Sequence, residues 1–255
     1  MAQGNWGIER VAGARSEALT LTDTEIHIWQ ANLMLSSYER EQFAKTLSAD
    51  EQARANRFRF LQDTHRFVVS RGILRALLGQ YLQIDPAQIA FGYSERGKPS
   101  LANAQATAGL VFNLSHSEDF MVCAIARQGC VGIDLEYIRP ITDLEDLTKR
   151  FFSPQEHTAI HALSGEARLR SFFQHWTCKE ALLKATGDGL ISLSAIRVSI
   201  EDNRAQLLSW QSATHPGKQW SLHLFEPASG YVAAIAMDAP HHSITFCQWN
   251  SIEHP

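Results

Sequence analysis

Three short segments of the sequence carry acidic and basic side chains at spacings that could do chemistry. The first is Gly132-Ile-Asp-Leu-Glu136. Side chains alternate between the two faces of a β-strand, so a strand here would place Asp134 and Glu136 on one face and point Leu135 into the core. Two neighbouring carboxylates repel each other unless a cation lies between them, and a hard divalent ion such as Mg²⁺ prefers oxygen ligands. The same pattern also fits a solvated strand end that binds nothing.

The second segment, residues 176–184, is Trp-Thr-Cys-Lys-Glu-Ala-Leu-Leu-Lys. On a helix Trp176, Glu180 and Lys184 lie at i, i+4 and i+8 and therefore share one face. A surface Glu–Lys pair is the simplest interpretation, but a large aromatic on the same face indicates that other parts of the protein cover it. A covered carboxylate next to two lysines could be a metal ligand, a base or both, and Lys184 could neutralise a phosphate.

The third group combines the loop Gly97-Lys98-Pro99 with residues 113–117, Asn-Leu-Ser-His-Ser. A lysine in a loop stiffened by proline could donate hydrogen bonds to a phosphate. The Ser115-His116 pair at the end of a strand could do the same. The alternatives are a hydrogen-bonded surface or core histidine at His116 and a solvated helix arginine at Arg66. The Gly-rich motifs of Rossmann and P-loop proteins are absent from the sequence, as are H-E-x-x-H and G-x-S-x-G.

Capping patterns predict the helices that position these groups. Ser48 with Glu51 forms a capping box that opens a basic helix, and Asp63 could cap a longer helix that ends near residue 82. Ser153, Pro154 and Glu156 match the first positions of another helix. A helical stretch over residues 166–185 would end at Gly187 and Gly189, because glycine tolerates the left-handed conformation.

Strands are predicted from alternation and from short apolar runs. Residues before about Thr22 form a poorly specified leader. The expected strands cover residues 25–33, 89–93, 120–126, 131–136, 195–200, 219–225, 231–237 and 244–248.

A weak internal repeat runs through this arrangement. Residues 70–79 align with residues 178–187, and residues 120–126 align with residues 231–236 with one residue of slack. Isoleucine strands follow both helical stretches, at Ile89 and Ile196. We therefore expect two similar α+β halves joined near residues 139–143; chance similarity between amphipathic segments is the alternative.

The composition narrows the class of protein further. The chain has 255 residues, 45% of them hydrophobic, and a formal net charge of -4, so no global positive field indicates a nucleic-acid partner. Its four cysteines form no C-x-x-C pair, which is typical of reduced thiols in a cytosolic protein. No secretory signal is visible, and the apolar run over residues 120–133 is broken by Arg127 and Gln128 and is too short to span a bilayer. We expect a soluble, cytoplasmic protein without a membrane partner.

Five segments, taken in order, resemble the phosphopantetheinyl transferases of the surfactin-synthetase-activating type. They are Gly97-Lys-Pro, residues 113–117, residues 131–136, Phe151-Phe-Ser and residues 176–184. The resemblance spans residues 48–189, and the form of the Trp-x-x-Lys-Glu-Ala segment is similar to the branch that serves polyketide, fatty-acid-like or peptide synthases. It implies an α+β pseudo-dimer of two similar halves, each a small antiparallel sheet packed with helices, with the active site in the cleft between them. Residues 1–138 would form the N-terminal half and residues 139–255 the C-terminal half.

The resemblance also implies an activity. A monomeric, Mg²⁺-dependent enzyme would transfer the 4′-phosphopantetheine group of coenzyme A to a serine of an apo acyl or peptidyl carrier protein and release 3′,5′-ADP. Glu180 would accept the serine proton, directly or through water, and Lys184 would neutralise the departing oxygen. The first half would hold the adenosine end of coenzyme A and the first two carboxylates, and the second half the Trp-x-x-Lys-Glu-Ala helix.

Carried over residue by residue, the resemblance gives three sets. The metal ligands would be Asp134, Glu136 and Glu180. Lys179 and Lys184 would contact the pyrophosphate. The adenosine end would be held by Gly97, Lys98, Pro99, Ser115, His116 and Arg66, with His116 and Arg66 on the 3′-phosphate. Family members often carry more lysine ahead of the Arg66 helix, where this chain has Glu51 and Arg54.

Two rival functions stay open at this point. One is a non-catalytic module of the same fold that binds coenzyme A or a carrier protein, although the intact acidic and lysine positions argue against it. The other is a different magnesium-dependent phosphoryl-group enzyme that acts on a nucleotide.

Overall fold

The computed structural model of this protein describes residues 10–12, 19–188, 190–210, 212, 214–238 and 243–250, so most of the expected leader and Gly189 lie outside the described residues. The helices are α1 (Ser37–Thr46), α2 (Ala49–Ala55), α3 (Leu61–Leu82), α4 (Leu144–Phe151), α5 (Pro154–His161) and α6 (Gly165–Thr186). The strands are β1 (Arg10–Ala12), β2 (Glu25–Asn32), β3 (Phe91–Tyr93), β4 (Pro99–Leu101), β5 (Val111–Ser117), β6 (Phe120–Ala126), β7 (Val131–Tyr137), β8 (Arg197–Glu201), β9 (Arg204–Ser209), β10 (Ser221–Phe225), β11 (Tyr231–Met237) and β12 (Ser243–Trp249). Within this part of the chain no helix is long and apolar enough to cross a membrane.

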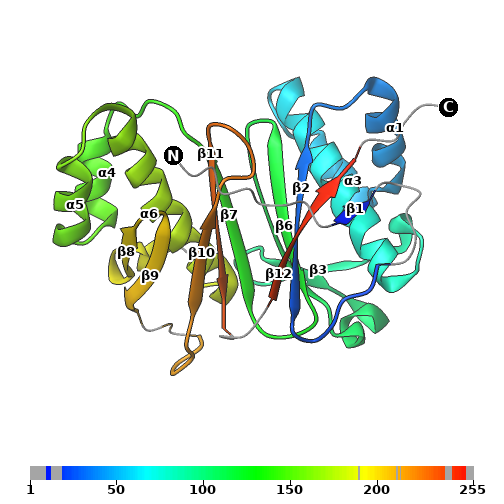
Figure 1. Ribbon diagram of the computed structural model, residues 1–255. Helices are drawn as coiled ribbons and strands as arrows, with labels where there is room; N and C mark the ends of the chain where they lie inside the picture. The colour runs from blue at the N-terminus through cyan, green and yellow to red at the C-terminus, as the bar shows by residue number, and fades with distance from the viewer. Residues whose placement is uncertain are drawn as a thin grey trace.

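The order of these elements repeats once along the chain (Figure 1). In the first half, β2 leads through two short helices to the 22-residue helix α3, then to the hairpin β3–β4 and to β5 and β6. In the second half, β7 leads through α4 and α5 to the 22-residue helix α6, then to the hairpin β8–β9 and to β10 and β11. Both sheets have the same antiparallel order, β2-β6-β5 and β7-β11-β10. The expected α+β fold of two similar halves is confirmed.

Each sheet also includes one strand from the other side of the expected boundary at residue 138. β7 precedes that residue but pairs with β11 in the second sheet. β12 follows it but pairs in parallel with β2 and β1 in the first sheet. The division of the chain at residue 138 stays a prediction, and β12 is a strand whose partner the sequence did not reveal.

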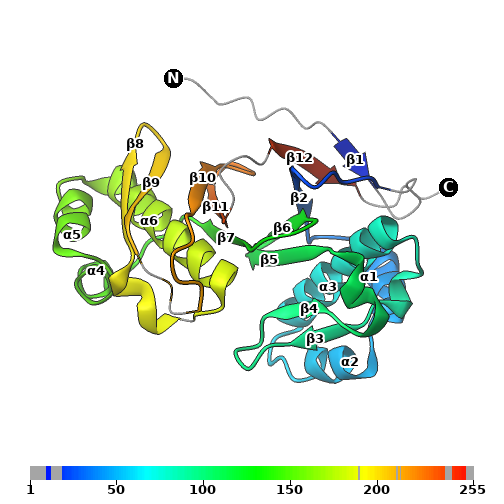
Figure 2. The same cartoon turned by 90° about the horizontal axis from the view of Figure 1, so that it is seen from below.

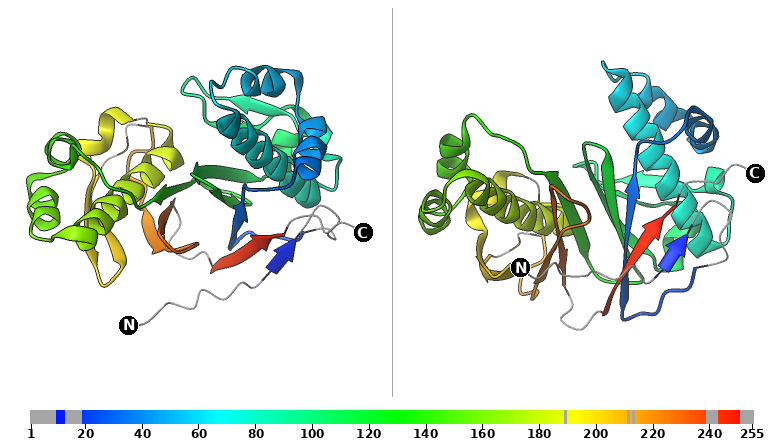
Figure 3. Two further views of the ribbon diagram at one scale, coloured as in Figure 1. Left: turned by 90° about the horizontal axis from the view of Figure 1, so that it is seen from above. Right: turned by 45° about the horizontal axis from the view of Figure 1, so that its top comes forward.

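The helices cover one face of each sheet, and the other two faces pack together. In both views of Figure 3 the helices of the second half, green to yellow, lie on the left and those of the first half, blue to cyan, on the right, with the two larger sheets between them. Residues from β2 and β6 form a shared core with residues from β7 and β11, among them Ile28, Ile133 and Leu135. The prediction that Leu135 points into the core is therefore confirmed, and strand alternation turns Asp134 and Glu136 toward the opposite face, where α6 packs.

The capping patterns were correct at three helices and wrong at one. Ser48 and Glu51 form the expected capping box at the start of α2. The side chain of Ser153 accepts from the backbone of Glu156 at the start of α5, and Gly187 ends α6 with φ +76°. Helix α3 instead begins two residues before Asp63, with Phe60 as its N-cap. Asp63 lies in the first turn, where its negative charge interacts favourably with the helix dipole. Helix α1, which opens with a capping box of Ser36 and Glu39, was not predicted.

Helices α3 and α6 are equivalent to each other, but their residues align differently from the repeat that the sequence suggested. Each ends at a residue in the left-handed conformation, Gln83 after α3 and Gly187 after α6. Counting eight residues back from each end places Arg75 opposite Lys179. The alignment of residues 70–79 with residues 178–187 is thus displaced by about one helical turn.

Candidate active site

The candidate site lies where β5 of the first sheet meets β7 of the second (Figure 2). Side chains of β5 link the two strands, since the side-chain oxygen of Asn113 accepts from the amide of Ile133 at 2.9 Å. The hydroxyl of Ser117 likewise accepts from the amide of Tyr137 at 3.1 Å. These bonds hold the two halves in a fixed register, and Ser115 and His116 of β5 lie between them along the strand.

Asp134, Lys184 and Ser115 form a closed triangle of hydrogen bonds across the two halves. The ammonium of Lys184 donates to Asp134 Oδ1 at 2.6 Å and to Ser115 Oγ at 2.9 Å. Ser115 in turn donates to the same carboxylate oxygen at 3.1 Å. Asp134 is only 4% exposed, and its second oxygen, Oδ2, is buried without a hydrogen-bond partner. A buried oxygen left unpaired is costly, so this atom points to a ligand that completes it.

The close approach of α6 to β7 depends on Gly132. A Cβ atom at this position would lie 2.1 Å from the carbonyl oxygen of Ala181 and 2.2 Å from the amide of Ala185. Any side chain here would therefore push the helix off the strand. Glycine allows the contact that brings Glu180 and Lys184 within reach of Asp134.

The electrostatics of Glu180 and Glu136 show three carboxylates that repel one another. Burial, the charge of Asp134 and, to a smaller extent, that of Glu136 raise the pKa of Glu180 to about 7, against the opposing charge of Lys184. Burial and Asp134 also raise the pKa of Glu136, against hydrogen bonds from Arg139 and Ser117. A carboxyl group that titrates near neutral pH can accept a proton there.

The donor set fits a hard divalent cation, although the three carboxylates are not gathered around one point. Within the described ranges no three His, Cys, Asp or Glu side chains lie close enough together to hold a metal ion. The Lys184 ammonium lies beside Asp134 and supplies the positive charge there. The unpaired Oδ2 of Asp134 and the raised pKa values of Glu136 and Glu180 are the features that a Mg²⁺ ion would relieve.

Basic side chains gather next to this acidic group. The exposed ring of His116 has its pKa lowered first by partial desolvation and then by the charges of Lys184, Arg66 and Arg54. The guanidinium of Arg66 is held by Glu118 at 2.7 Å and Asp119 at 2.9 Å. Arg54 was not assigned to the site from the sequence, and its position on the basic helix α2 was the only signal for it. Together these groups make a positive region suited to a phosphate.

The loop Gly97-Lys98-Pro99 docks on the C-terminal end of α6. Lys98 donates to the carbonyl of Ala185 at 2.8 Å, and Arg96 donates to the carbonyls of Gly187 and Asp188. The last carbonyls of a helix lack intrahelical partners and carry partial negative charge, which explains why two cations bind there. Gly97, with φ +80°, makes the turn. The loop thus reaches from the first half to the second, next to the triangle of Asp134, Lys184 and Ser115.

The prediction that Lys179 contacts the pyrophosphate is wrong. Its side chain is fully buried and its ammonium donates to Glu156 at 2.8 Å and to the carbonyl of Phe151 at 3.2 Å. Successive helix residues point about 100° apart, so Lys179 cannot share the face of Glu180. It instead ties α6 to the start of α5. Trp176 packs edge-on to Phe151 with ring centroids 5.8 Å apart, so this part of the helix face is covered, as expected.

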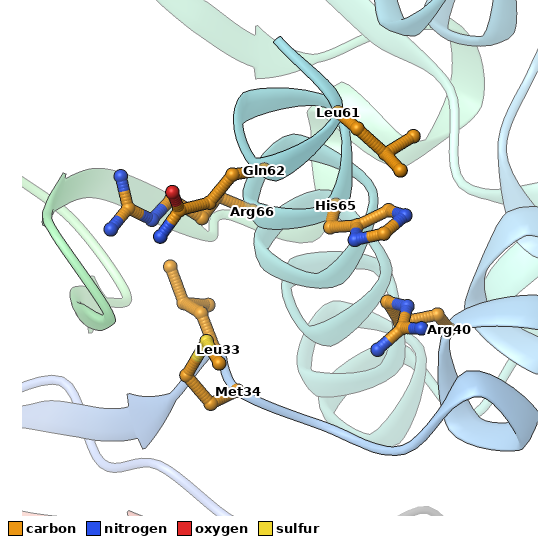
Figure 4. Close-up of a pocket in the computed structure, with 7 residues that line it drawn as sticks. All are labelled: Leu33, Met34, Arg40, Leu61, Gln62, His65 and Arg66. Atoms are coloured by element: carbon orange, nitrogen blue, oxygen red, sulfur yellow. The ribbon is translucent and has the colours of Figure 1, made fainter.

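A separate apolar pocket of about 280 Å³ lies at the edge of the first half (Figure 4). Arg66 borders it, but the carboxylates of the site do not. Its lining residues are Leu33, Met34, Arg40, Leu61, Gln62, His65 and Arg66.

Comparisons with known proteins point to one family of enzymes. Residues 34–128 match the model of the 4′-phosphopantetheinyl transferase N-terminal family, and residues 130–236 match that of the 4′-phosphopantetheinyl transferase superfamily. The chain is 45% identical over 219 residues to 4′-phosphopantetheinyl transferase HetI of Nostoc sp., covering 86% of this chain and 90% of that protein. It is 31% identical over 207 residues to 4′-phosphopantetheinyl transferase Sfp of Bacillus subtilis, covering 81% and 88%. A holo-(acyl-carrier-protein) synthase from Bacillus anthracis solved with coenzyme A aligns with 42% of this chain and 93% of its own at 21% identity and a TM-score of 0.36.

Proposed function

This chain belongs to the 4′-phosphopantetheinyl transferase family, and we propose that the site between β5, β7 and α6 carries out its reaction. The enzyme transfers the 4′-phosphopantetheine group from coenzyme A to a serine hydroxyl of an apo carrier protein and releases 3′,5′-ADP. The observation that carries the assignment of the site is the convergence of Asp134, Lys184 and Ser115 from three separate segments.

Two residues of α6 supply the proton transfer and the charge neutralisation. A serine hydroxyl is a poor nucleophile, and Glu180, whose pKa lies at about 7, accepts its proton as the bond to phosphorus forms. The ammonium of Lys184 swings from Asp134 to the pyrophosphate and neutralises the charge that develops on the departing oxygen. Ser115 stays on Asp134 and keeps that carboxylate in place.

Asp134, Glu136 and Glu180 would hold Mg²⁺. When bound there, the ion would supply positive charge that stabilises the negative charge of the pyrophosphate. The unpaired Oδ2 of Asp134 supports this assignment.

The basic region would bind the 3′-phosphate and the adenosine. His116 and Arg66 keep the roles that the resemblance implied, and Arg54 joins them because its charge acts on His116. Lys98, Gly97 and Pro99 border the adenosine from the hairpin loop. For a phosphate to bind Arg66, the carboxylates of Glu118 and Asp119 must yield part of their contact with it.

Narrower assignments are also proposals. We place the chain in the surfactin-synthetase-activating branch, on the basis of its Trp-x-x-Lys-Glu-Ala segment. We propose that it acts as a monomer in the cytoplasm, with residues 1–138 and 139–255 as its two halves. Its four cysteines are all free, which supports a reducing compartment.

Mass spectrometry of an apo carrier protein incubated with coenzyme A, Mg²⁺ and this enzyme tests the proposed function. We expect a gain of about 340 Da, the mass of phosphopantetheine less water, and no gain on a carrier whose acceptor serine is alanine. Tight coenzyme A binding without any mass gain would indicate the non-catalytic binding module instead.

A further inference from the structure

A second cluster of reactive side chains lies around Cys130, at the start of β7 and away from the carboxylates. The sulfur of Cys130 lies 3.4 Å from His215 Nε2 and 3.6 Å from the ammonium of Lys218. The backbone amide of Cys130 donates to Asp238 at 2.9 Å, and Lys218 also pairs with Asp238. Lys98 is a third basic neighbour. The charge of the Cys130 sulfur raises the pKa of Lys98, although burial, the larger effect, lowers that pKa. Three basic side chains thus surround one thiol.

The other three cysteines have the opposite surroundings. Cys123, Cys178 and Cys247 are each 0% exposed, whereas Cys130 is partly exposed. Burial raises the pKa of the thiols of Cys123 and Cys178 far above the ordinary range. The thiolate is the nucleophilic form of cysteine, and basic neighbours together with access to solvent favour it. The chain therefore contains one thiol whose surroundings suit reaction and three whose surroundings prevent it.

We propose that Cys130 is a thiol-modification site that forms a mixed disulfide with low-molecular-weight disulfides. The thiolate of Cys130, with His215 and Lys218 donating to it, attacks one sulfur of the small disulfide. A bond forms between Sγ and that sulfur, the original S–S bond breaks, and the other half leaves as a thiolate. Cys130 is oxidised and the departing half is reduced, so no further oxidant is needed.

A chain of hydrogen bonds connects this thiol to the hairpin loop of the active site. His215 Nδ1 lies 2.8 Å from Thr214 Oγ1, which donates to Asp188 Oδ1 at 2.8 Å. The carbonyl of Asp188 accepts from Arg96, one residue before Gly97. An adduct on Cys130 would displace His215 and disturb this chain. Modification therefore weakens the binding of coenzyme A, a consequence that rests on the proposed function, whereas the reactivity of the thiol does not.

Reaction of the native protein with glutathione disulfide, followed by intact mass and peptide mapping, tests the reactive thiol. We expect one adduct, located on Cys130, and none in Cys130→Ser. In urea all four thiols should react at similar rates, and Cys130 should react about tenfold faster in the native protein than in the unfolded one. An adduct on another cysteine first, or a native rate no faster than the unfolded rate, would overturn the proposal.

Variants of the two donors test the cause of that reactivity. His215→Gln and Lys218→Met should each slow the reaction about fivefold or more, since each removes a donor to the thiolate. Lys149→Met is the matched control, because Lys149 is an exposed lysine paired with a glutamate on α4, and its rate should not change. Rates equal to wild type in both donor variants would contradict the assignment.

Calorimetric titration with coenzyme A tests the connection to the loop. We expect about tenfold weaker binding after glutathione modification, and unchanged binding in unmodified Cys130→Ser. Equal affinity before and after modification would overturn the connection. If the unmodified protein does not bind coenzyme A, the proposed function fails, while the mapped adduct still decides the identity of the thiol.

Discussion

The two halves of this enzyme share a scaffold but differ at the positions that do chemistry. In each half, the long helix carries a buried basic residue that pairs with the capping-box glutamate of the preceding helix. Arg75 contacts Glu51 at 2.7 Å in the first half, and Lys179 contacts Glu156 at 2.8 Å in the second. These pairs satisfy buried charge and fix each long helix to the short one, so they belong to the fold.

The charged residues of the site have uncharged counterparts in the first half. On the helix-facing side of each sheet, Trp29 lies opposite Cys123 on β6 as Asp134 lies opposite Ala234 on β11. Ala31 and Glu136 likewise lie opposite Met121 and Val232. Counting back from the ends of the long helices makes Ala76 the counterpart of Glu180 and Gln80 that of Lys184. The sheet-and-helix unit is thus used twice, while these carboxylates and Lys184 occur in one copy only.

The largest effect on stability is expected at the buried ion pair that occurs in both halves. It would confirm that these pairs stabilise the fold. Lys179→Met should lower the free energy of unfolding by about 3–5 kcal/mol, because it leaves the buried Glu156 without its cation. Arg75→Met should lower it by less, because Arg71 still lies 3.4 Å from Glu51. Urea unfolding measures this, and Lys149→Met, at an exposed i,i+4 pair, should leave the unfolding midpoint nearly unchanged. Normal stability with lost coenzyme A binding in Lys179→Met would return this lysine to the active site.

Lys184→Met should separate the affinity for Mg²⁺ from the rate of the reaction. The ammonium lies 2.6 Å from Asp134 Oδ1 and repels a cation at the neighbouring Oδ2, so its removal should raise Mg²⁺ affinity about tenfold in titration calorimetry. At saturating Mg²⁺ the single-turnover rate should still fall about 10- to 100-fold, because the leaving oxygen loses a counter-charge. Gln80→Met, at the counterpart position in α3, is the control and should alter neither. Weaker Mg²⁺ binding in Lys184→Met would mean that the lysine helps to build the metal site.

A smaller effect should appear in the pH dependence of stability without metal. The folded pKa of Glu180, about 7, lies above its ordinary value of 4.5, so the folded state holds the proton more tightly than the unfolded state does. Stability is therefore lost as the pH rises from about 4.5 to 7, and the full penalty is present above that range. Glu180→Gln should raise the free energy of unfolding by about 1–2 kcal/mol at pH 8 and by little at pH 4.5.

Glu145→Gln is the control for this pH effect. Its hydrogen bond to Lys149 lowers the pKa of Glu145, so the substitution should bring no stabilisation at pH 8. Equal stabilisation of Glu180→Gln at both pH values would show that the carboxylate is not strained by its neighbours.

The sequence predicted the side-chain positions that depend on local periodicity alone. A period of two placed Asp134 and Glu136 on one strand face, and a period of about four placed Glu180 and Lys184 on one helix face. Lys179 was assigned wrongly because its position in the motif says nothing about the buried Glu156 that binds it. The repeat was displaced by one turn because apolar residues recur at i and i+4, so helices slipped by four residues still match.

Features that depend on distant partners could not be predicted in this way. The parallel pairing of β12 with β2 joins segments more than 200 residues apart, and no short motif marks it. The contact of Arg96 and Lys98 with the end of α6 likewise depends on how the two halves meet. Arg54 lies near His116 only because α2 folds against α3.

Single-turnover transfer by Asp134→Asn, compared with Trp29→Phe at the counterpart position in β2, tests the central claim that chemistry belongs to the second copy alone. Asparagine keeps the size of the side chain but removes the charge that holds Lys184 and would hold Mg²⁺. At limiting Mg²⁺ we predict a loss of at least about 10²-fold in Asp134→Asn with little change in stability, and a rate within about twofold of wild type in Trp29→Phe. Near-normal turnover by Asp134→Asn would contradict the assignment of this carboxylate, and with it the contrast between the two halves.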